Sequence, residues 1–180
     1  MKISPSEIVY VFDLDDTLVK TDAKIKVFCS KSKKLLHALT PADYNYYVRK
    51  EHHILNFDDF DDLNILLSGT LIRENVDILK EASKKHKIGI VTARAHLGSV
   101  VHFVHNINLP VSQDLIYVVN DPIERFIGDI PERKKQAFQQ MIENGFHHFV
   151  YYDDNLENLE RVKELEDKNI KIETHHVIHG

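Results

Sequence analysis

The sequence predicts an α/β fold, a doubly wound, Rossmann-like parallel sheet with a small insertion after the first strand. Short apolar runs rich in Val, Ile and Tyr recur along the chain, and amphipathic helical patterns lie between them. This alternation implies βαβ units with right-handed crossovers. The first two runs are separated by far more residues than one crossover helix needs, which predicts the insertion.

The predicted strands follow from length and pattern. Four apolar runs have the length of strands buried on both faces of a sheet, and they lie at 8–12, 88–91, 115–119 and 149–152. A fifth segment, 170–178, alternates apolar and polar residues and predicts an edge strand.

The predicted helices come from apolar residues spaced three or four apart. This spacing places one apolar stripe of each helix against the sheet. Pro131 marks the start of the third helix and Gly145 its end. The four patterns span 72–79, 97–104, 137–142 and 156–165.

The insertion covers about residues 19–70. Strands at 24–28 and 34–39 flank the sequence SKSK as a hairpin, and a short helix follows from Pro41, capped by Thr40. The acidic sequence FDDFDD at 57–62 is interpreted as a solvated loop with helix capping, because adjacent Asp side chains diverge too much to share a metal.

Composition limits the classes of partner. The formal charge of −5, from 28 acidic and 23 basic residues, gives no overall attraction to nucleic acid or to an anionic membrane. The single cysteine, Cys29, excludes an internal disulfide and fits a reducing compartment. The N-terminal apolar run is too short for a signal peptide or a membrane span, so we expect a cytoplasmic protein without a membrane partner.

A basic stretch lies in the predicted hairpin. Charge runs usually face water, and we interpret this one as a solvated surface, with a rim that faces the substrate as the alternative. Its members are Lys24, Lys26, Lys31, Lys33 and Lys34.

Polar residues follow three of the predicted strands. In an open α/β sheet, ligands bind at the carboxyl ends of the strands, so these residues are expected at one rim. They are Asp13 and Asp15 after the first run, Thr92 and Arg94 after the second, and Asp153 and Asp154 after the fourth.

Several carboxylates at one rim repel one another and need a compensating cation. Mg²⁺ prefers oxygen ligands and combines one or two carboxylates with water and phosphate, so the pattern predicts magnesium. The alternative is that these aspartates cap the following helices, and Asp16 is interpreted in that way. Capping alone does not require acids at both places of Asp13-x-Asp15 and a second pair after another strand.

The ordered motifs resemble those of the haloacid dehalogenase (HAD) superfamily. DLDDT follows a hydrophobic strand, a threonine ends a second strand, a lysine opens a helix, and a pair of acids ends a later strand. The four motifs of the superfamily fall on Asp13 with Asp15, on Thr92, on Lys134, and on Asp153 with Asp154. The resemblance spans residues 9–154 and implies a single HAD-like domain, 1–180, in which the insertion at about 19–70 is a small cap.

The resemblance implies a phosphohydrolase that forms an aspartyl-phosphate on Asp13. Asp15 would act as general acid and base, and its backbone carbonyl would bind the metal. Thr92 would donate to a phosphate oxygen. The metal ligands would be Asp13, Asp15, Asp153 and Asp154, and which of the last two binds directly stays open.

Lys134 would offset the negative charge of Asp13 and the phosphate. The adjacent Lys135 is the alternative, but Lys134 follows Pro131 in the first turn of the helix. Its spacing from Asp153 resembles that in polynucleotide 3′-phosphatase domains. The sequence Thr92-Ala93-Arg94 is similar to the Ser/Thr-x-Arg motif of those domains and of several acid phosphatases. Arg94 could bind a second phosphate, or pair with a surface acid.

The expected substrate is a phosphorylated compound, with a nucleotide or a nucleic-acid phosphate end favoured. The insertion also resembles that of HAD members from large viral genomes, and this resemblance gives no information about the substrate. The open alternatives are a phosphotransferase of the same superfamily, which shares the chemistry of Asp13, and a non-catalytic binding protein with the same fold. A response-regulator receiver is disfavoured by the order of the motifs. In receivers the acid pair follows the first strand and the phosphoacceptor follows the third, whereas here Asp13-x-Asp15 follows the first strand and the acid pair follows the fourth.

Overall fold

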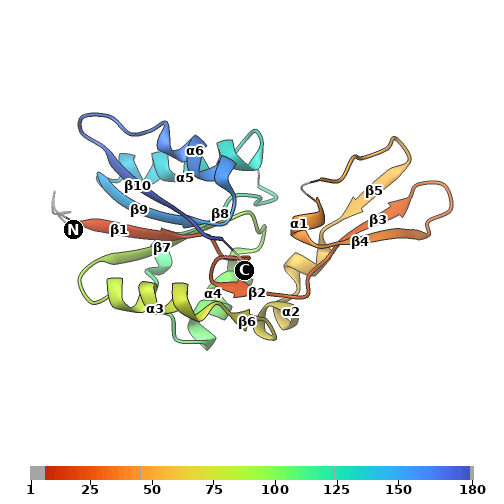
Figure 1. Ribbon diagram of the computed structural model, residues 1–180, viewed down its shortest axis with the longest axis horizontal. Coiled ribbons are helices and arrows are strands. Elements are labelled where there is room, and N and C mark those ends of the chain that lie inside the picture. Colours follow the sequence, from red (N-terminus) through yellow and green to blue (C-terminus); the bar gives the residue numbers. More distant parts are fainter. Residues whose placement is uncertain (1–6, 45, 124, 179–180) are drawn as a thin grey trace. The chain divides into compact units, whose positions relative to one another are not determined.

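The centre of the fold is a five-stranded sheet with the strand order β10-β9-β1-β7-β8 (Figure 1). The computed structural model describes residues 7–44, 46–123 and 125–178. By its internal contacts the chain divides into unit 1, Met1–Lys20 with Thr70–Gly180, and unit 2, Thr21–Gly69.

Unit 1 contains the parallel sheet, its helices and a two-stranded antiparallel pair at the exit to unit 2. Its strands are β1 Ile8–Phe12, β2 Val19–Lys20, β6 Thr70–Leu71, β7 Lys87–Thr92, β8 Ile116–Val118, β9 His148–Asp153 and β10 Lys171–His176. Its helices are α3 Arg73–Ala82, α4 Leu97–Asn106, the 3₁₀ turn η2 Gln113–Leu115, α5 Ile130–Glu143 and α6 Leu156–Lys163.

All neighbouring strands of the large sheet run parallel, which confirms the predicted α/β class. The central strand β1 pairs with β7 on one side and with β9 on the other. β10 lies at an edge, as its alternating sequence predicts. Each predicted strand is present; β1 matches its predicted range, and the ends of the others differ from the prediction by at most two residues.

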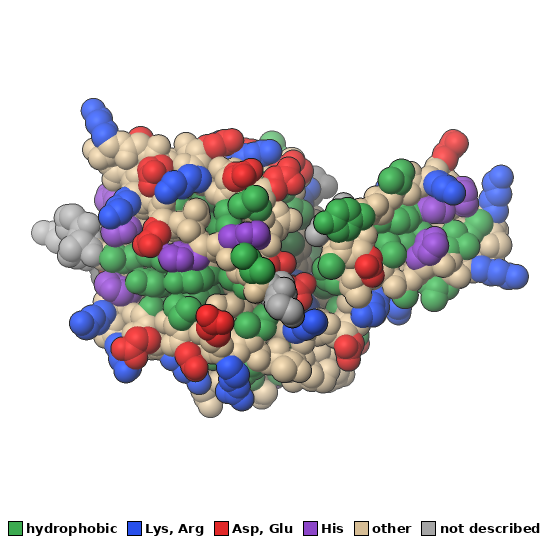
Figure 2. All heavy atoms as spheres, in the orientation of Figure 1, with side chains coloured by type: hydrophobic (Ala, Val, Ile, Leu, Met, Phe, Trp, Pro, Cys, Tyr) green, Lys and Arg blue, Asp and Glu red, His purple; other side chains and the backbone are tan. Residues whose placement is uncertain are grey.

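The helices cover both faces of the sheet. α5 and α6 lie on one face and α3 and α4 on the other (Figure 1). Charged side chains are distributed over the surface (Figure 2). Asp129 caps the start of α5, because its side chain accepts from the backbone N–H of Glu132 at 3.0 Å. It ends before Gly145, whose φ of 104° suits the residue that follows a helix.

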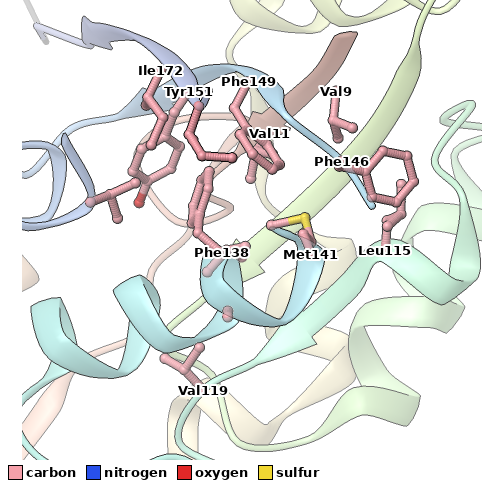
Figure 3. Packing of buried hydrophobic residues seen from close by; sticks show 14 of the residues in the cluster. Val9, Val11, Leu115, Val119, Phe138, Met141, Phe146, Phe149, Tyr151 and Ile172 are labelled. Carbon is pink, nitrogen blue, oxygen red and sulfur yellow. The ribbon is translucent and has the colours of Figure 1, made fainter. Parts of the chain in front are cut away.

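The main core lies between the sheet and the helices α5 and α6. Val9 and Val11 of β1 are fully buried there. The ring of Phe138 on α5 packs against Phe149 and Tyr151 of β9, with centroid separations of 5.3 and 4.8 Å (Figure 3). This packing fixes α5 against β9, and both elements contribute to the site described below.

Unit 2 is built on a three-stranded antiparallel sheet of order β4-β3-β5. The predicted hairpin and the helix capped by Thr40 are confirmed. β5 and α2 were not predicted. β5 has only four residues and gains its stability from pairing with β3. Asp62 caps α2, in line with the capping predicted for the acidic run. The elements are β3 Ile25–Cys29, β4 Leu35–Leu39, α1 Pro41–Tyr44, β5 His53–Asn56, η1 Asp58–Asp61 and α2 Leu63–Leu67.

Among the described residues, no helix is both long and apolar enough to cross a membrane.

Gly89 of β7 lies too close to its neighbours to accommodate a side chain, and this can be tested. A Cβ at this position would lie 2.9 Å from the carbonyl oxygen and 3.3 Å from the Cβ of Leu115. Gly89→Ala should therefore lower the free energy of unfolding by about 1–3 kcal/mol, because backbone must move to relieve the clash. Chemical denaturation measures the change.

The control is Gly98→Ala on α4. No heavy atom lies within 4 Å of a Cβ built there, so the same substitution should raise stability by about 0.5–1 kcal/mol. Equal effects of the two substitutions would contradict this account of β7.

Candidate active site

The candidate site lies at the carboxyl ends of β1, β7 and β9. Along the chain, β1 is followed by β7 and β8 on one side of it, and then by β9 and β10 on its other side. The order of strands therefore reverses at β1, the position where open α/β sheets bind ligands. Asp13 directly follows β1, Thr92 ends β7, and Asp153 ends β9.

Asp13 is the central carboxylate of the site. Its backbone N–H donates to the carbonyl of Tyr152 at 2.9 Å, so the ladder between β1 and β9 fixes the start of the loop. One carboxylate oxygen accepts from Lys134 Nζ at 2.9 Å, and the other lies 3.4 Å from the hydroxyl of Thr17. The residue is only 6% exposed.

Lys134 bridges two of the carboxylates. Its Nζ donates to Asp13 at 2.9 Å and to Asp153 at 2.8 Å, and the residue is 1% exposed. Lys135 points elsewhere and pairs with Glu164 at 3.1 Å. The packing of Phe138 against β9 aims this face of α5 at the sheet, and so selects Lys134 of the two neighbours.

Asp153 is held by four donors. Lys134 Nζ, the hydroxyl of Tyr151 and Nδ2 of Asn158 all donate to its Oδ2, the last at 3.2 Å. The backbone N–H of Asn155 donates to Oδ1 at 2.8 Å. With Asp153 completely buried and held in this way, the less buried Asp154 is the better placed of the two to meet a ligand from solvent.

Asp13, Asp153 and Asp154 form a compact acidic group, because one oxygen of each lies within 4.8 Å of the others. Burial raises the pKa of Asp13 well above its ordinary value, and the negative charge of Asp153 adds to this while Lys134 opposes it. Burial, followed by repulsion from Asp153, raises the pKa of Asp154 to about 6 even though a hydrogen bond with Asp13 opposes the shift. Asp13 and Asp154 therefore keep their protons to a higher pH than isolated aspartates do, and a cation bound there would displace these protons.

The same charges act on Lys134. Burial by itself would lower its pKa, but attraction to Asp13 and Asp153 outweighs burial and raises the pKa above its ordinary value. Lys134 is therefore a permanent cation at neutral pH.

Asp15 and Arg94 form a bidentate ion pair. Nε and Nη2 of Arg94 donate to the two oxygens of Asp15 at 2.8 and 2.7 Å. Arg94 is 3% exposed, and the side chain of Asp15 is 22% exposed. The guanidinium thus holds the Asp15 carboxylate in one orientation, and the binding of a second phosphate by Arg94 stays a prediction.

Thr92 is buried at the end of β7. Its hydroxyl oxygen accepts from the backbone N–H of Arg94 at 3.2 Å, so its own proton can be donated to another group. Asp16 does not precede a helix, which corrects its interpretation as a helix cap. It lies in a turn with a φ of 61°, and its N–H donates to the carbonyl of Val19.

Four supporting residues were not identified from the sequence. Tyr151 lies two positions before Asp153 in β9, a spacing that places both on one face of the strand. Asn158 lies three positions after the Asn155 cap of α6. Thr17 contacts Asp13, and Asn75 Nδ2 donates to the backbone carbonyl of Thr17 at 2.8 Å. The sequence offered a signal for two of them, the spacing of Tyr151 from Asp153 and the place of Thr17 in the DLDDT motif.

The donor set suits a hard divalent cation. The three acids offer only carboxylate oxygens, in a group compact enough to share an ion. Their three negative charges exceed the single positive charge of Lys134 when all are ionised. A divalent cation would neutralise the remainder, so the residues present fit Mg²⁺.

No protein-family model and no curated protein matches the chain in sequence. Solved structures do resemble it. One is a chain of the Pnkp1/Rnl/Hen1 RNA repair complex, with a TM-score of 0.57 and 12% identity over 96% of this chain. The present chain spans 44% of that protein, less than half its length.

Two further structures match over most of both chains. A HAD family enzyme from Bacteroides thetaiotaomicron, in complex with magnesium and inorganic phosphate, has a TM-score of 0.51 and 12% identity and covers 97% of each chain. A haloacid dehalogenase-like hydrolase from Streptococcus pneumoniae has a TM-score of 0.50 and 13% identity, covering 94% of this chain and 84% of its own. At these identities the likeness concerns the fold, and the chain has the fold of HAD proteins.

Proposed function

We propose that the chain is a Mg²⁺-dependent phosphohydrolase that transfers a phosphoryl group to Asp13 and then to water. The observation that supports this best is the compact set of Asp13, Asp153 and Asp154 with Lys134 between two of them, at the reversal point of the sheet. Lys134 and the cation would compensate the charge of an incoming phosphate, which the carboxylates alone would repel.

In the first step, an oxygen of Asp13 attacks phosphorus while the bond from phosphorus to the leaving oxygen breaks. Asp15 gives its proton to that oxygen, and an aspartyl-phosphate remains on Asp13. In the structure both oxygens of Asp15 accept from Arg94, so Asp15 must take up a proton and release at least one of these hydrogen bonds before it acts as the acid. Thr92 would donate its free hydroxyl proton to a phosphoryl oxygen.

In the second step, water attacks the phosphorus of the aspartyl-phosphate and Asp15 takes a proton from that water. The bond between phosphorus and the Asp13 oxygen breaks, which releases inorganic phosphate and restores the carboxylate. Lys134 stays charged throughout and stabilises the carboxylate of Asp13 each time it is regenerated.

The residues that would hold Mg²⁺ are Asp13, the backbone carbonyl of Asp15, and Asp154 in preference to Asp153. When bound, the ion supplies positive charge to the phosphoryl oxygens, which favours the charge distribution of phosphoryl transfer. Asp153 then serves mainly to hold Lys134, because its oxygens already accept four hydrogen bonds.

For the substrate we favour a nucleotide or a nucleic-acid phosphate end. The similar chain from an RNA repair complex and the Thr92-Ala93-Arg94 sequence support this choice. Unit 2 occupies the predicted insertion, and its role as a cap is part of the same proposal. A phosphotransferase would use the same Asp13, and analysis of the products separates it from a hydrolase.

The central test is phosphate release from an aryl phosphate and from a panel of 3′- and 5′-phosphorylated nucleotides, with Mg²⁺. Asp13→Asn should lower turnover by about 10³-fold or more, because the amide cannot form the intermediate. The variant should be at least as stable as the parent without metal, since it removes a buried like charge. Full turnover in Asp13→Asn would refute the mechanism.

Neighbouring lysines provide the matched control. Lys134→Met should abolish turnover, whereas Lys135→Met should leave it nearly unchanged, because Lys135 pairs only with a surface glutamate. Circular dichroism checks that the Lys134 variant folds. No phosphate release by the parent protein from any substrate would favour the non-catalytic binding protein.

Asp15→Asn tests the acid and base role. Turnover of an alkyl phosphate should fall by about 10²–10⁴-fold, because its poor leaving group needs the proton. An aryl phosphate should still release its phenol in an initial burst, since only its second step needs the base. Rapid-quench kinetics on both substrates measure this, and equal losses in the first step of both would exclude Asp15 as the acid.

The raised pKa of Asp154 predicts how Mg²⁺ stabilises the protein. Its value of about 6, against an ordinary 3.8, means that the folded metal-free chain loses stability as pH rises through that window. Added Mg²⁺ should therefore raise the melting temperature more at about pH 7.5 than at about pH 5. Asp154→Asn should remove most of this difference, and a Mg²⁺ effect independent of pH in the parent would contradict the assignment.

A further inference from the structure

The three-stranded sheet of unit 2 has one covered face and one bare face. On the covered face, Val27 is fully buried and His53 is 6% exposed. Tyr47 stacks on His53, with ring centroids 5.8 Å apart, and Tyr44 stacks on Tyr47. These aromatic rings and the short helix α1 form a small core on that side of the sheet.

The bare face carries an apolar row across all three strands. Phe28 of β3 is the direct partner of Leu35 on β4 and of Ile54 on β5, so the three side chains share a face. Leu35 is 53% exposed and Ile54 is 42% exposed. We name Phe28, Leu35 and Ile54 the bare row.

A basic cluster lies at one end of the same sheet. The backbone N–H of Ser30 donates to the carbonyl of His52, and Cys29 pairs with His53, so the turn after β3 and the segment before β5 meet there. Glu51 is the one acid in residues 30–34 and 48–53. The cluster consists of Lys31, Lys33, Lys34, Arg49 and Lys50.

The cluster is exposed and carries a net positive charge. Within the described part of the chain, none of its five side chains forms an ion pair. The opposite end of the unit holds the acidic run, where Lys26 pairs with Asp59 at 3.3 Å. The face is therefore positive at one end only, next to the bare row.

We propose that this face of unit 2 binds single-stranded nucleic acid, with phosphates on the basic cluster and bases on the bare row. A single strand offers a line of negative charges beside flat apolar rings, and stacking on an aromatic side chain tolerates any base. A duplex conceals its bases and matches only the charges. The proposal goes beyond the phosphohydrolase reaction and does not depend on it.

The charge of the face is tested by fluorescence anisotropy with the full chain and labelled 12-mer DNA and RNA that carry hydroxyl at both ends, so that no phosphate monoester can enter the site of unit 1. The triple variant Lys31→Gln, Lys33→Gln, Lys34→Gln should weaken binding at least about 10-fold at low salt. It should also make the plot of log affinity against log salt shallower by about 2, the value for three phosphate contacts on a single strand.

The matched control is Lys80→Gln, Lys85→Gln, Lys168→Gln, which makes the same change of net charge on exposed lysines of unit 1. It should leave both the affinity and the salt slope close to those of the parent. Equal effects of the two triple variants would show a general charge effect and overturn the proposal.

The bare row is tested by Phe28→Leu and Phe28→Tyr. Leucine keeps the apolar side chain but lacks the ring, so it should weaken single-strand binding about 10-fold, whereas tyrosine should retain it. Because Phe28 is partly buried, Leu35→Thr with Ile54→Thr, on exposed sites that tolerate β-branched residues, should also weaken binding.

Hydrolysis of a small aryl phosphate is measured for every variant. Unchanged hydrolysis with lost oligonucleotide binding would support the face, and oligonucleotide binding in a chain without hydrolysis would support the face while refuting the proposed reaction. Failure of the parent to bind, tighter binding of a duplex, or a preference for an acidic, aromatic-rich peptide over the oligonucleotides would each overturn the inference.

Discussion

One buried interaction organises the site: the ammonium of Lys134 between the carboxylates of Asp13 and Asp153. A lysine that is 1% exposed is tolerated only where opposite charges replace its water. The carboxylates have the same need, but they outnumber the lysine by three to one. The fold therefore maintains a negative site that retains protons or attracts a cation, and this imbalance is the physical basis of the proposed magnesium chemistry.

The sheet topology supplies the rigidity that this arrangement needs. β1 is central, so Asp13 follows a strand that is held on both sides by parallel neighbours. Asp153 ends the adjacent strand, and the aromatic packing of Phe138 against β9 sets the direction from which Lys134 approaches. Tyr151 joins the two regions, because its ring packs in the core while its hydroxyl donates to Asp153. A change in the packing of this core would therefore shift the position of the Asp153 carboxylate.

Unit 2 differs from unit 1 in how its apolar side chains are covered. It has too few residues for a large core, and only one face of its sheet is covered, by tyrosine and histidine rings. The other face leaves apolar side chains next to unpaired lysines within the described residues. An exposed apolar row of this kind suits a binding surface, whereas the polar groups of the site in unit 1 are mostly paired with one another.

The sequence by itself determined the α/β class, the five parallel strands, the insertion and the positions of the acids, because apolar runs and helical spacing are local signals. It did not determine β5, whose four residues become a strand only through pairing with β3. The choice between Lys134 and Lys135 also required the tertiary structure, because adjacent helical positions differ only in the direction that packing gives them. The same holds for the pairing of Arg94 with Asp15 and for the donors around Asp153, which join residues from separate strands and helices. Local pattern specifies which elements form, and only their packing decides which side chains meet.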